Sequence, residues 1–125
     1  MLGLSGGKDS LTMLHCLLQL QKRSPYKFDL ACVTVDPQTN GFDPRYAFLF
    51  LSYAFSPLRA YCHKIGVPYY YESRSIVQLA ATKMQNNSLC SFCSRMKRGV
   101  LYSTMRREGY NVLVYGDEYD FYWCP

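Results

Sequence analysis

The stretch that decides the fold is Leu2-Gly-Leu-Ser-Gly-Gly-Lys-Asp-Ser-Leu11. Leu2 to Leu4 predicts a short strand, Ser5 to Ser10 predicts a turn, and leucines then recur at helical spacing at positions 11, 14, 17 and 18. Strand, loop and helix in this order are typical of an α/β fold, in which ligands bind at the carboxyl ends of the strands. The loop is therefore expected at the ligand-binding edge of a sheet.

The remainder of the chain continues this alternation. We expect strands at 28–36, 67–71 and 111–116, a helix ending near 65, a helix at about 75–85, and a helix that follows Cys90 to Cys93 and is closed by Gly109. These elements predict a parallel sheet with helices on both faces, which is incomplete because no helix follows the last strand. Pro37 to Pro57 has no clear period and is not placed. An insertion is expected around residues 45–57 of a single domain, 1–125.

Composition excludes several classes of protein. The 125 residues suffice for one core, and 49% hydrophobic with 18% charged residues excludes disorder. Tyr46 to Phe55 is about half of a membrane-spanning length, so no membrane association is expected. Met1 to Ser10 has no basic segment before an apolar one, which predicts a cytoplasmic protein whose six cysteines are reduced. Metal or redox chemistry then suits the cysteines better than a disulfide scaffold.

The net charge of +5 is concentrated in one segment. Ser94 to Arg107 contains five basic residues and no acid, whereas the rest of the chain has nine of each sign. A neutral body with one basic segment favours a polyanionic partner such as nucleic acid. The alternative is a solvated helix face.

The residues of the loop suit a phosphate. Gly6 and Gly7 let the backbone turn tightly and point N–H groups at an anion, beside the positive end of a helix that begins near Asp9. Ser5 and Ser10 can donate hydroxyls, Lys8 supplies charge, and Asp9 can cap the helix or help to hold Mg²⁺. The glycine spacing differs from that of a Walker A motif. The plain alternative is a Gly-Gly turn with a capping side chain.

A strand followed by SGGKDS resembles the PP-loop of the ATP pyrophosphatases, which cleave ATP to AMP and pyrophosphate. The resemblance implies an adenine nucleotide alpha hydrolase-like, Rossmann-like domain that binds ATP and Mg²⁺ through Ser5, Gly6, Gly7, Lys8, Asp9 and Ser10, with Asp9 as a catalytic residue. The superfamily includes GMP and NAD synthetases and tRNA-thiolating enzymes. The loop alone does not choose among them.

A second motif, Cys90-Ser-Phe-Cys93, leads into the basic helix. Two thiolates three residues apart can hold a metal, and by spacing alone the pair suits half a zinc site, a redox pair or coincidence. With the following Ser-Arg-Met-Lys-Arg-Gly-Val-Leu-Tyr102, the segment resembles that of the tRNA 2-thiocytidine synthetases. In that family the pair supplies two of three cysteine ligands of a [4Fe-4S] cluster that carries sulfur. The resemblance makes Cys90 and Cys93 metal ligands and catalytic residues.

The helix after the cysteines has a basic stripe. At 100° per residue one face carries four residues suited to phosphate neutralisation and base stacking: Arg95, Arg98, Tyr102 and Arg106. We predict that this face binds tRNA, the alternative being a solvated face. Met96, Val100, Leu101 and Met105 lie towards the other side.

Smaller resemblances continue across the chain. Asp36 ends the second strand where the family has an Asp, and it either contacts nucleotide or magnesium or caps a loop. Gly116 and Asp120 match a nucleotide-site segment whose other residues differ here. Cys16 and Cys32 are expected to be core thiols, Cys62 is unassigned, and His15 and His63 are not expected to be catalytic. The family's third cluster cysteine has no matching residue, and Cys124 lies in a different context.

The resemblance implies the amino-terminal part of a tRNA thiolase, a truncated member of its family. ATP would adenylate a tRNA base, and cluster-borne sulfur would then form 2-thiocytidine. The expected partners are tRNA and a sulfur donor such as a cysteine desulfurase, and pairing of two copies is compatible with the sequence. Two alternatives are an inactive homologue that binds nucleotide or RNA and another AMP-forming PP-loop ligase.

Overall fold

The computed structural model describes residues 1–38, 57–83 and 89–116, and these build a parallel sheet. Its three strands are β1 (Leu2–Gly3), β2 (Cys32–Asp36) and β3 (Tyr69–Ser73), in the order β1-β2-β3. Leu2 pairs with Cys32, and Cys32 pairs with Tyr69. On the other side of β1, Val114 makes an isolated parallel bridge to Leu2.

The strand predicted at 111–116 is therefore reduced to this bridge among the described residues. The Gly3 N–H donates to the Val114 carbonyl at 2.8 Å, and the Val114 N–H donates to the Met1 carbonyl at 2.9 Å. From one edge to the other the segments run 3-2-1-4 along the chain, which is the order of a Rossmann-like sheet. The order reverses between β1 and Val114, where such sheets bind their ligands.

Strands β2 and β3 begin later along the chain than predicted, because neighbouring residues limit where their backbone pairing can start. Val67 and Pro68 precede β3, and proline has no N–H to donate to a ladder. The Pro68 carbonyl instead accepts from the Cys32 N–H at 2.8 Å, at the first residue of β2. On the other side of β2, the pairing with β1 begins at Leu2, which lies opposite Cys32. Residues 28–31 therefore precede the paired part of β2.

The helices are α1 (Lys8–Arg23), residues 57–64, α3 (Ile76–Lys83) and α4 (Leu89–Arg107). Helix α1 ends where Ser24, the residue before Pro25, is extended. Gly66 and Gly109 have φ values of 71° and 79°, so both take the left-handed conformation after their helices, in agreement with the helix ends expected near 65 and at Gly109. Helix α4 begins at Leu89, so Cys90 and Cys93 lie inside the helix that was expected to follow them.

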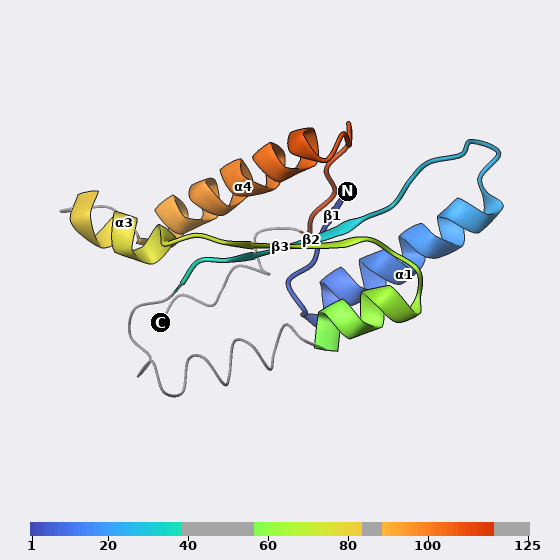
Figure 1. Ribbon diagram of the computed structural model, residues 1–125, viewed down its shortest axis with the longest axis horizontal. Coiled ribbons are helices and arrows are strands. Elements are labelled where there is room, and N and C mark those ends of the chain that lie inside the picture. Colours follow the sequence, from blue (N-terminus) through green and yellow to red (C-terminus); the bar gives the residue numbers. More distant parts are fainter. Residues whose placement is uncertain (39–56, 84–88, 117–125) are drawn as a thin grey trace.

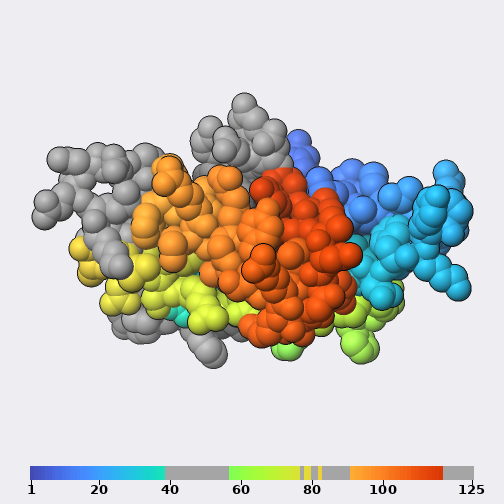
Figure 2. All heavy atoms as spheres, turned by 90° about the horizontal axis from the view of Figure 1, so that it is seen from above, coloured from blue at the N-terminus to red at the C-terminus, as the bar shows by residue number. Residues whose placement is uncertain are grey.

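The helices cover both faces of the sheet, which confirms the predicted fold class. Helix α1 and residues 57–64 lie on one face and α4 lies on the other (Figure 1). Seen from above, α4 lies across the middle of the molecule (Figure 2). The first face buries a cluster that includes Leu14, Cys32 and Cys62, and the second buries Val33 with Leu101 and Met105.

Several expectations fall on residues that the structure does not describe. The insertion around 45–57 lies outside the described residues except at Pro57, and so do Asp120 and Cys124. Within the described ranges, no helix has the length and apolar character needed to cross a membrane.

Leu14 tests the core beneath α1. It is fully buried, so Leu14→Ala is expected to lower the free energy of unfolding by about 2–5 kcal/mol through lost burial and a residual cavity. Leu20→Ala is the matched control, because Leu20 on the same helix is 54% exposed, and its effect is expected within about 0.5 kcal/mol. Urea denaturation measures both. Equal effects of the two substitutions would contradict the placement of α1.

Candidate functional site

The loop Ser5 to Ser10 leaves the carboxyl end of β1 and enters α1. Gly7 is the N-cap residue in an extended conformation, with no hydrogen bond from a capping side chain. Asp9 is exposed in the first turn of α1, so the structure does not use it as the cap. The first N–H groups of the helix consequently have no side-chain cap and lie where a sheet of this order binds anions.

Hydroxyl groups brace the inside of this loop. The Ser10 hydroxyl, which is 1% exposed, donates to the Gly7 carbonyl at 3.0 Å. The Ser5 hydroxyl donates to Ser10 Oγ at 3.1 Å and accepts from the Gly7 N–H at 3.3 Å. Lys8 is exposed, and its side chain is on the outside of the braced turn. The loop is held in shape by its serines, with its charged side chains in solvent.

Gly6 meets both conditions that exclude a side chain. Its φ of 88° lies in the left-handed region, and a Cβ atom there would be 3.3 Å from Leu58 Cδ1. Leu58 belongs to helical residues 57–64, which pack on the same face as α1. The positive φ therefore favours glycine at position 6, and the nearby Leu58 side chain would have to shift slightly for a larger residue.

Asp36 ends β2 at the same edge of the sheet and is only 5% exposed. Its Oδ1 accepts from the Gln38 N–H at 2.9 Å, and its Oδ2 accepts from the Tyr71 hydroxyl at 2.7 Å. This is the loop-capping arrangement that the sequence left open beside nucleotide or magnesium contact. The carboxylate has hydrogen bonds on both oxygens.

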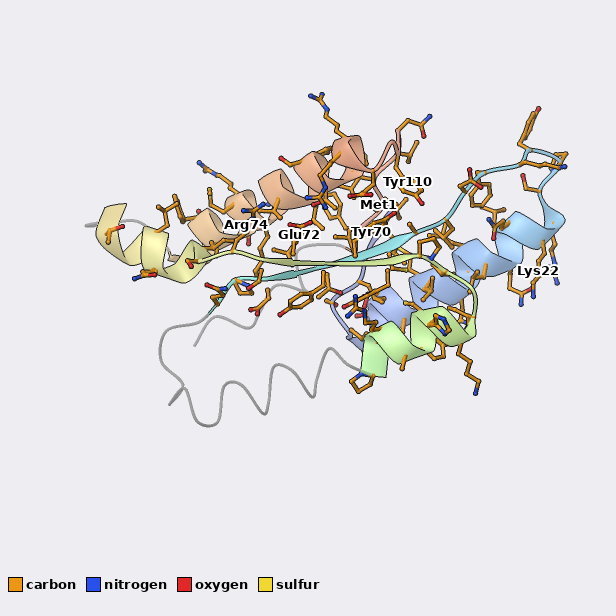
Figure 3. All side chains as sticks on the ribbon, viewed as in Figure 1. Met1, Lys22, Tyr70, Glu72, Arg74 and Tyr110 are labelled. Atoms are coloured by element: carbon orange, nitrogen blue, oxygen red, sulfur yellow. The ribbon has the colours of Figure 1, made fainter. Side chains whose placement is uncertain are left out.

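Tyr71 was missed by the sequence analysis. Its partner Asp36 is 35 residues away, and a run of three tyrosines does not say which of them faces the loop. The alternation of side chains along a strand, once the register is known, is the signal that separates them. Tyr70 and Glu72 lie on the α4 side of the sheet (Figure 3), so Tyr71 lies on the α1 side.

Cys90 and Cys93 lie in the first two turns of α4, three residues apart and therefore on one side of the helix. Cys93 is buried at 7% exposure, whereas the structure describes only the backbone of Cys90. The first turn has no acidic residue, so the positive end of the helix dipole favours thiolates there. Among the side chains that the structure describes, no three metal-ligating groups come together. The residues present fit two ligands of a metal centre.

Cys32 and Cys62 differ from Cys90 and Cys93 because they belong to the core beneath α1. Both are fully buried, Cys32 on β2 and Cys62 in residues 57–64. Burial raises the pKa of Cys32 to about 12 and also raises that of Cys62, so both stay protonated at neutral pH. The prediction that Cys32 is a core thiol is confirmed, and Cys62 joins it there.

Cys16 corrects another expectation, because it is exposed. It lies two residues after buried Leu14, a rotation of about 200° that turns it away from the sheet. His15 and His63 are also exposed, and His15 Nε2 is 2.7 Å from the Tyr61 hydroxyl.

The outer side of α4 is basic. Arg95, Tyr102 and Arg106 are exposed, Arg98 is half-buried, and Leu101 and Met105 are buried against the sheet as expected. Arg107 is paired with Glu72 at 2.5 Å and with Glu108 at 2.8 Å. The exposed positive charge on this side of α4 is therefore carried mainly by Arg95 and Arg106.

Gly116 lies two residues beyond the Val114 bridge, on the carboxyl side of that segment. This position places it at the reversal point of strand order, beside the end of β1. The predicted site residues thus divide between the carboxyl edge of the sheet and α4.

Curated relatives match almost the whole length of this chain. The chain is 36% identical over 121 residues to a tRNA-cytidine(32) 2-sulfurtransferase of Polaromonas naphthalenivorans, covering 96% of this chain and 35% of the relative. A protein of the same name from Stenotrophomonas maltophilia is also 36% identical, with 96% of this chain and 37% of the relative covered. The chain belongs to the TtcA-like tRNA-thiolase family.

A solved structure supports the fold of this TtcA-like chain. The U34-tRNA thiolase NcsA from Methanococcus maripaludis, solved with its [4Fe-4S] cluster, is similar with a TM-score of 0.62 and 26% identity. The match covers 92% of this chain and 36% of NcsA. No family model matches the chain. The chain spans about a third of the length of the curated relatives it matches.

Gly6→Ala tests the shape of the loop. We expect it to lower the free energy of unfolding by about 1–2 kcal/mol, because alanine is strained at this φ and crowds Leu58. Gly99→Ala in α4 is the control: nothing lies within 4 Å of its Cβ, and alanine should raise stability by about 0.5–1 kcal/mol. Thermal unfolding of both variants gives the answer. A stabilising Gly6→Ala would refute the geometry of the loop.

Proposed function

We propose that residues 1–125 form the PP-loop ATP-binding domain of a tRNA thiolase, a transferase that makes 2-thiocytidine. The observation that carries this proposal is the start of α4, where two cysteines three residues apart lie in the first two turns of a helix with an arginine-bearing outer side. The names of the curated relatives and of the similar solved structure support it.

The loop Ser5 to Ser10 would bind the phosphates of ATP. The uncapped N–H groups at the start of α1 donate to phosphate oxygens, and Lys8 supplies a positive charge. Exposed Asp9 would hold Mg²⁺ as a carboxylate ligand, since this cation prefers oxygen donors and keeps several waters. Gly116 would border the nucleotide across the reversal point, and Asp36 would lie at its other side.

In the reaction that we propose, the carbonyl oxygen of the cytidine attacks the α-phosphate of ATP. An O–P bond forms to the base, and the bond to pyrophosphate breaks. Lys8 and the N–H groups of the loop stabilise the negative charge that moves onto the leaving pyrophosphate. AMP is then the leaving group when sulfur replaces the oxygen on the base. The braced loop contributes by holding its donors in place before the charge develops.

Cys90 and Cys93 would hold a [4Fe-4S] cluster, with a third ligand from elsewhere. When bound, the cluster would supply the sulfur that enters the base, and a donor such as a cysteine desulfurase would replenish it. The chain's own contribution would be to place both cysteines near the positive end of the α4 dipole, with Arg95 nearby in sequence.

The outer side of α4 would contact tRNA. Arg95 and Arg106 are exposed for phosphate oxygens, half-buried Arg98 lies beside them on the same helix, and the ring of Tyr102 is 48% exposed for stacking. A basic stripe with an aromatic ring in its middle suits a flexible or looped RNA better than a regular duplex.

Anaerobic reconstitution with iron and sulfide tests the cysteine pair. We expect iron uptake and a visible charge-transfer band for the unsubstituted chain, and loss of both in Cys90→Ser/Cys93→Ser, because two ligands are gone. Cys16→Ser is the control, since Cys16 is exposed on α1, far along the chain from α4. Folded protein that takes up no iron would overturn the sulfur-transfer proposal for this chain.

Filter binding of tRNA over a range of salt concentrations tests the basic face. Arg95→Ala/Arg106→Ala is expected to weaken binding and to reduce the slope of log K against log salt by about 1–2, because two phosphate contacts are lost. Lys22→Ala/Arg23→Ala removes the same charge from the last turn of α1 and should change the slope less. Equal slopes for the two double variants would show that net charge alone attracts the RNA.

A further inference from the structure

The side chain of Tyr71 is partly exposed, and a hydrogen bond holds its hydroxyl group. Its side chain is 42% exposed, yet its hydroxyl donates to Asp36 Oδ2 at 2.7 Å, and Asp36 itself is buried. The pKa of Tyr71 is raised by burial and by the neighbouring Asp36, so the hydroxyl keeps its proton and continues to donate. The hydroxyl end of the ring is thus held in place, while the side chain is partly exposed.

A polar network fixes the surroundings of this pair. Gln38 has a φ of 50°, and its N–H donates to Asp36 Oδ1 at 2.9 Å. Its side-chain amide donates to Ser73 Oγ at 2.6 Å and accepts from the Ser75 hydroxyl at 2.6 Å. The ends of β2 and β3 are therefore tied together on the carboxyl side of Tyr71. These hydrogen bonds restrict the surroundings of the ring before any ligand binds, so less conformational entropy is lost on binding.

The ring lies on the same face of the sheet as the phosphate loop. Thr34, opposite Tyr71 in the register, donates to the Leu4 carbonyl at 2.6 Å, just before the loop begins. Side chains alternate along strands, so Thr34, Asp36 and Tyr71 share the α1 face. Strands β1 and β3 are two ladder spacings apart, about 10 Å. A nucleotide with its phosphates at the end of β1 can extend its base over this distance.

We propose that Tyr71 is the stacking platform for the base of the bound nucleotide, and that Asp36 is a positioning residue that holds the ring through its hydroxyl. The inference rests on the proposed function, since it assumes that the Ser5 to Ser10 loop holds the phosphates. It gives the capping geometry of Asp36 a role in nucleotide binding without a direct contact. The site then has two parts, a loop that recognises phosphate and a ring that recognises the base.

Calorimetric titration of the chain with Mg-ATP and with tripolyphosphate separates the two parts. Tyr71→Ala is expected to weaken ATP binding by roughly fivefold to a hundredfold, the range of one base–aromatic stack, and to leave tripolyphosphate binding unchanged. Tyr71→Phe keeps the ring and should bind ATP more tightly than Tyr71→Ala. Tyr26→Ala is the control, because Tyr26 is 81% exposed in the turn after α1 and should not affect either ligand.

Two single variants and one double variant test the role of Asp36 in the same titration. Asp36→Ala should weaken ATP binding without affecting tripolyphosphate, and Asp36→Asn should restore much of it, because the amide oxygen still accepts from the Tyr71 hydroxyl. Combining Asp36→Ala with Tyr71→Ala should add little to Tyr71→Ala alone, since the carboxylate acts through the ring.

Three outcomes would overturn the inference. If Tyr71→Ala binds ATP as the unsubstituted chain does, the ring is not the platform, although the proposed function stands. If Tyr71→Ala loses tripolyphosphate and ATP equally, Tyr71 supports the fold and not the base. If the unsubstituted chain binds neither ligand, the nucleotide part of the proposed function fails together with this inference.

Discussion

Strand β1 donates backbone hydrogen bonds to neighbours on both sides, and the rest of the structure depends on this double pairing. The N–H groups of Leu2 and Leu4 donate to the carbonyls of Ala31 and Val33, whereas Gly3 donates to Val114 on the opposite side. A Cβ on Gly3 would lie 3.3 Å from Tyr115 Cβ, so the glycine also permits this close approach. Hydrogen bonds on both sides thereby fix the end of β1, and this end sets the position of the Ser5 to Ser10 loop that follows it.

The two faces of the sheet serve different purposes in this arrangement. The α1 face holds the braced loop, Asp36 and Tyr71, and the proposed nucleotide chemistry belongs to it. The opposite face carries α4, with its cysteines in the first two turns and with Arg95 and Arg106 exposed. Because helices that connect parallel strands begin at the carboxyl edge, α1 and α4 both direct their positive ends towards it. One electrostatic property of helices thus suits both phosphate and thiolate.

Sequence reasoning succeeded where the local signal was strong. Hydrophobic spacing in α1, the left-handed glycines 66 and 109 and the strand-loop-helix order depend on nearby residues, and all appear in the structure. It was less successful where contacts with other segments of the chain determine the structure. Pro68 delays β3, the fourth strand is reduced to the Val114 bridge, and Cys16 is exposed although its surroundings are apolar. Tyr71 acquires its significance only from Asp36, which is far away along the chain.

The pair formed by Cys32 and Cys62 has a meaning that reaches beyond packing. A protein that handles reactive sulfur exposes all its own thiols to exchange with that sulfur, and the thiolate is the form that exchanges. Full burial keeps these two thiols protonated and out of reach. The same core that positions the loop thus keeps these two thiols unreactive.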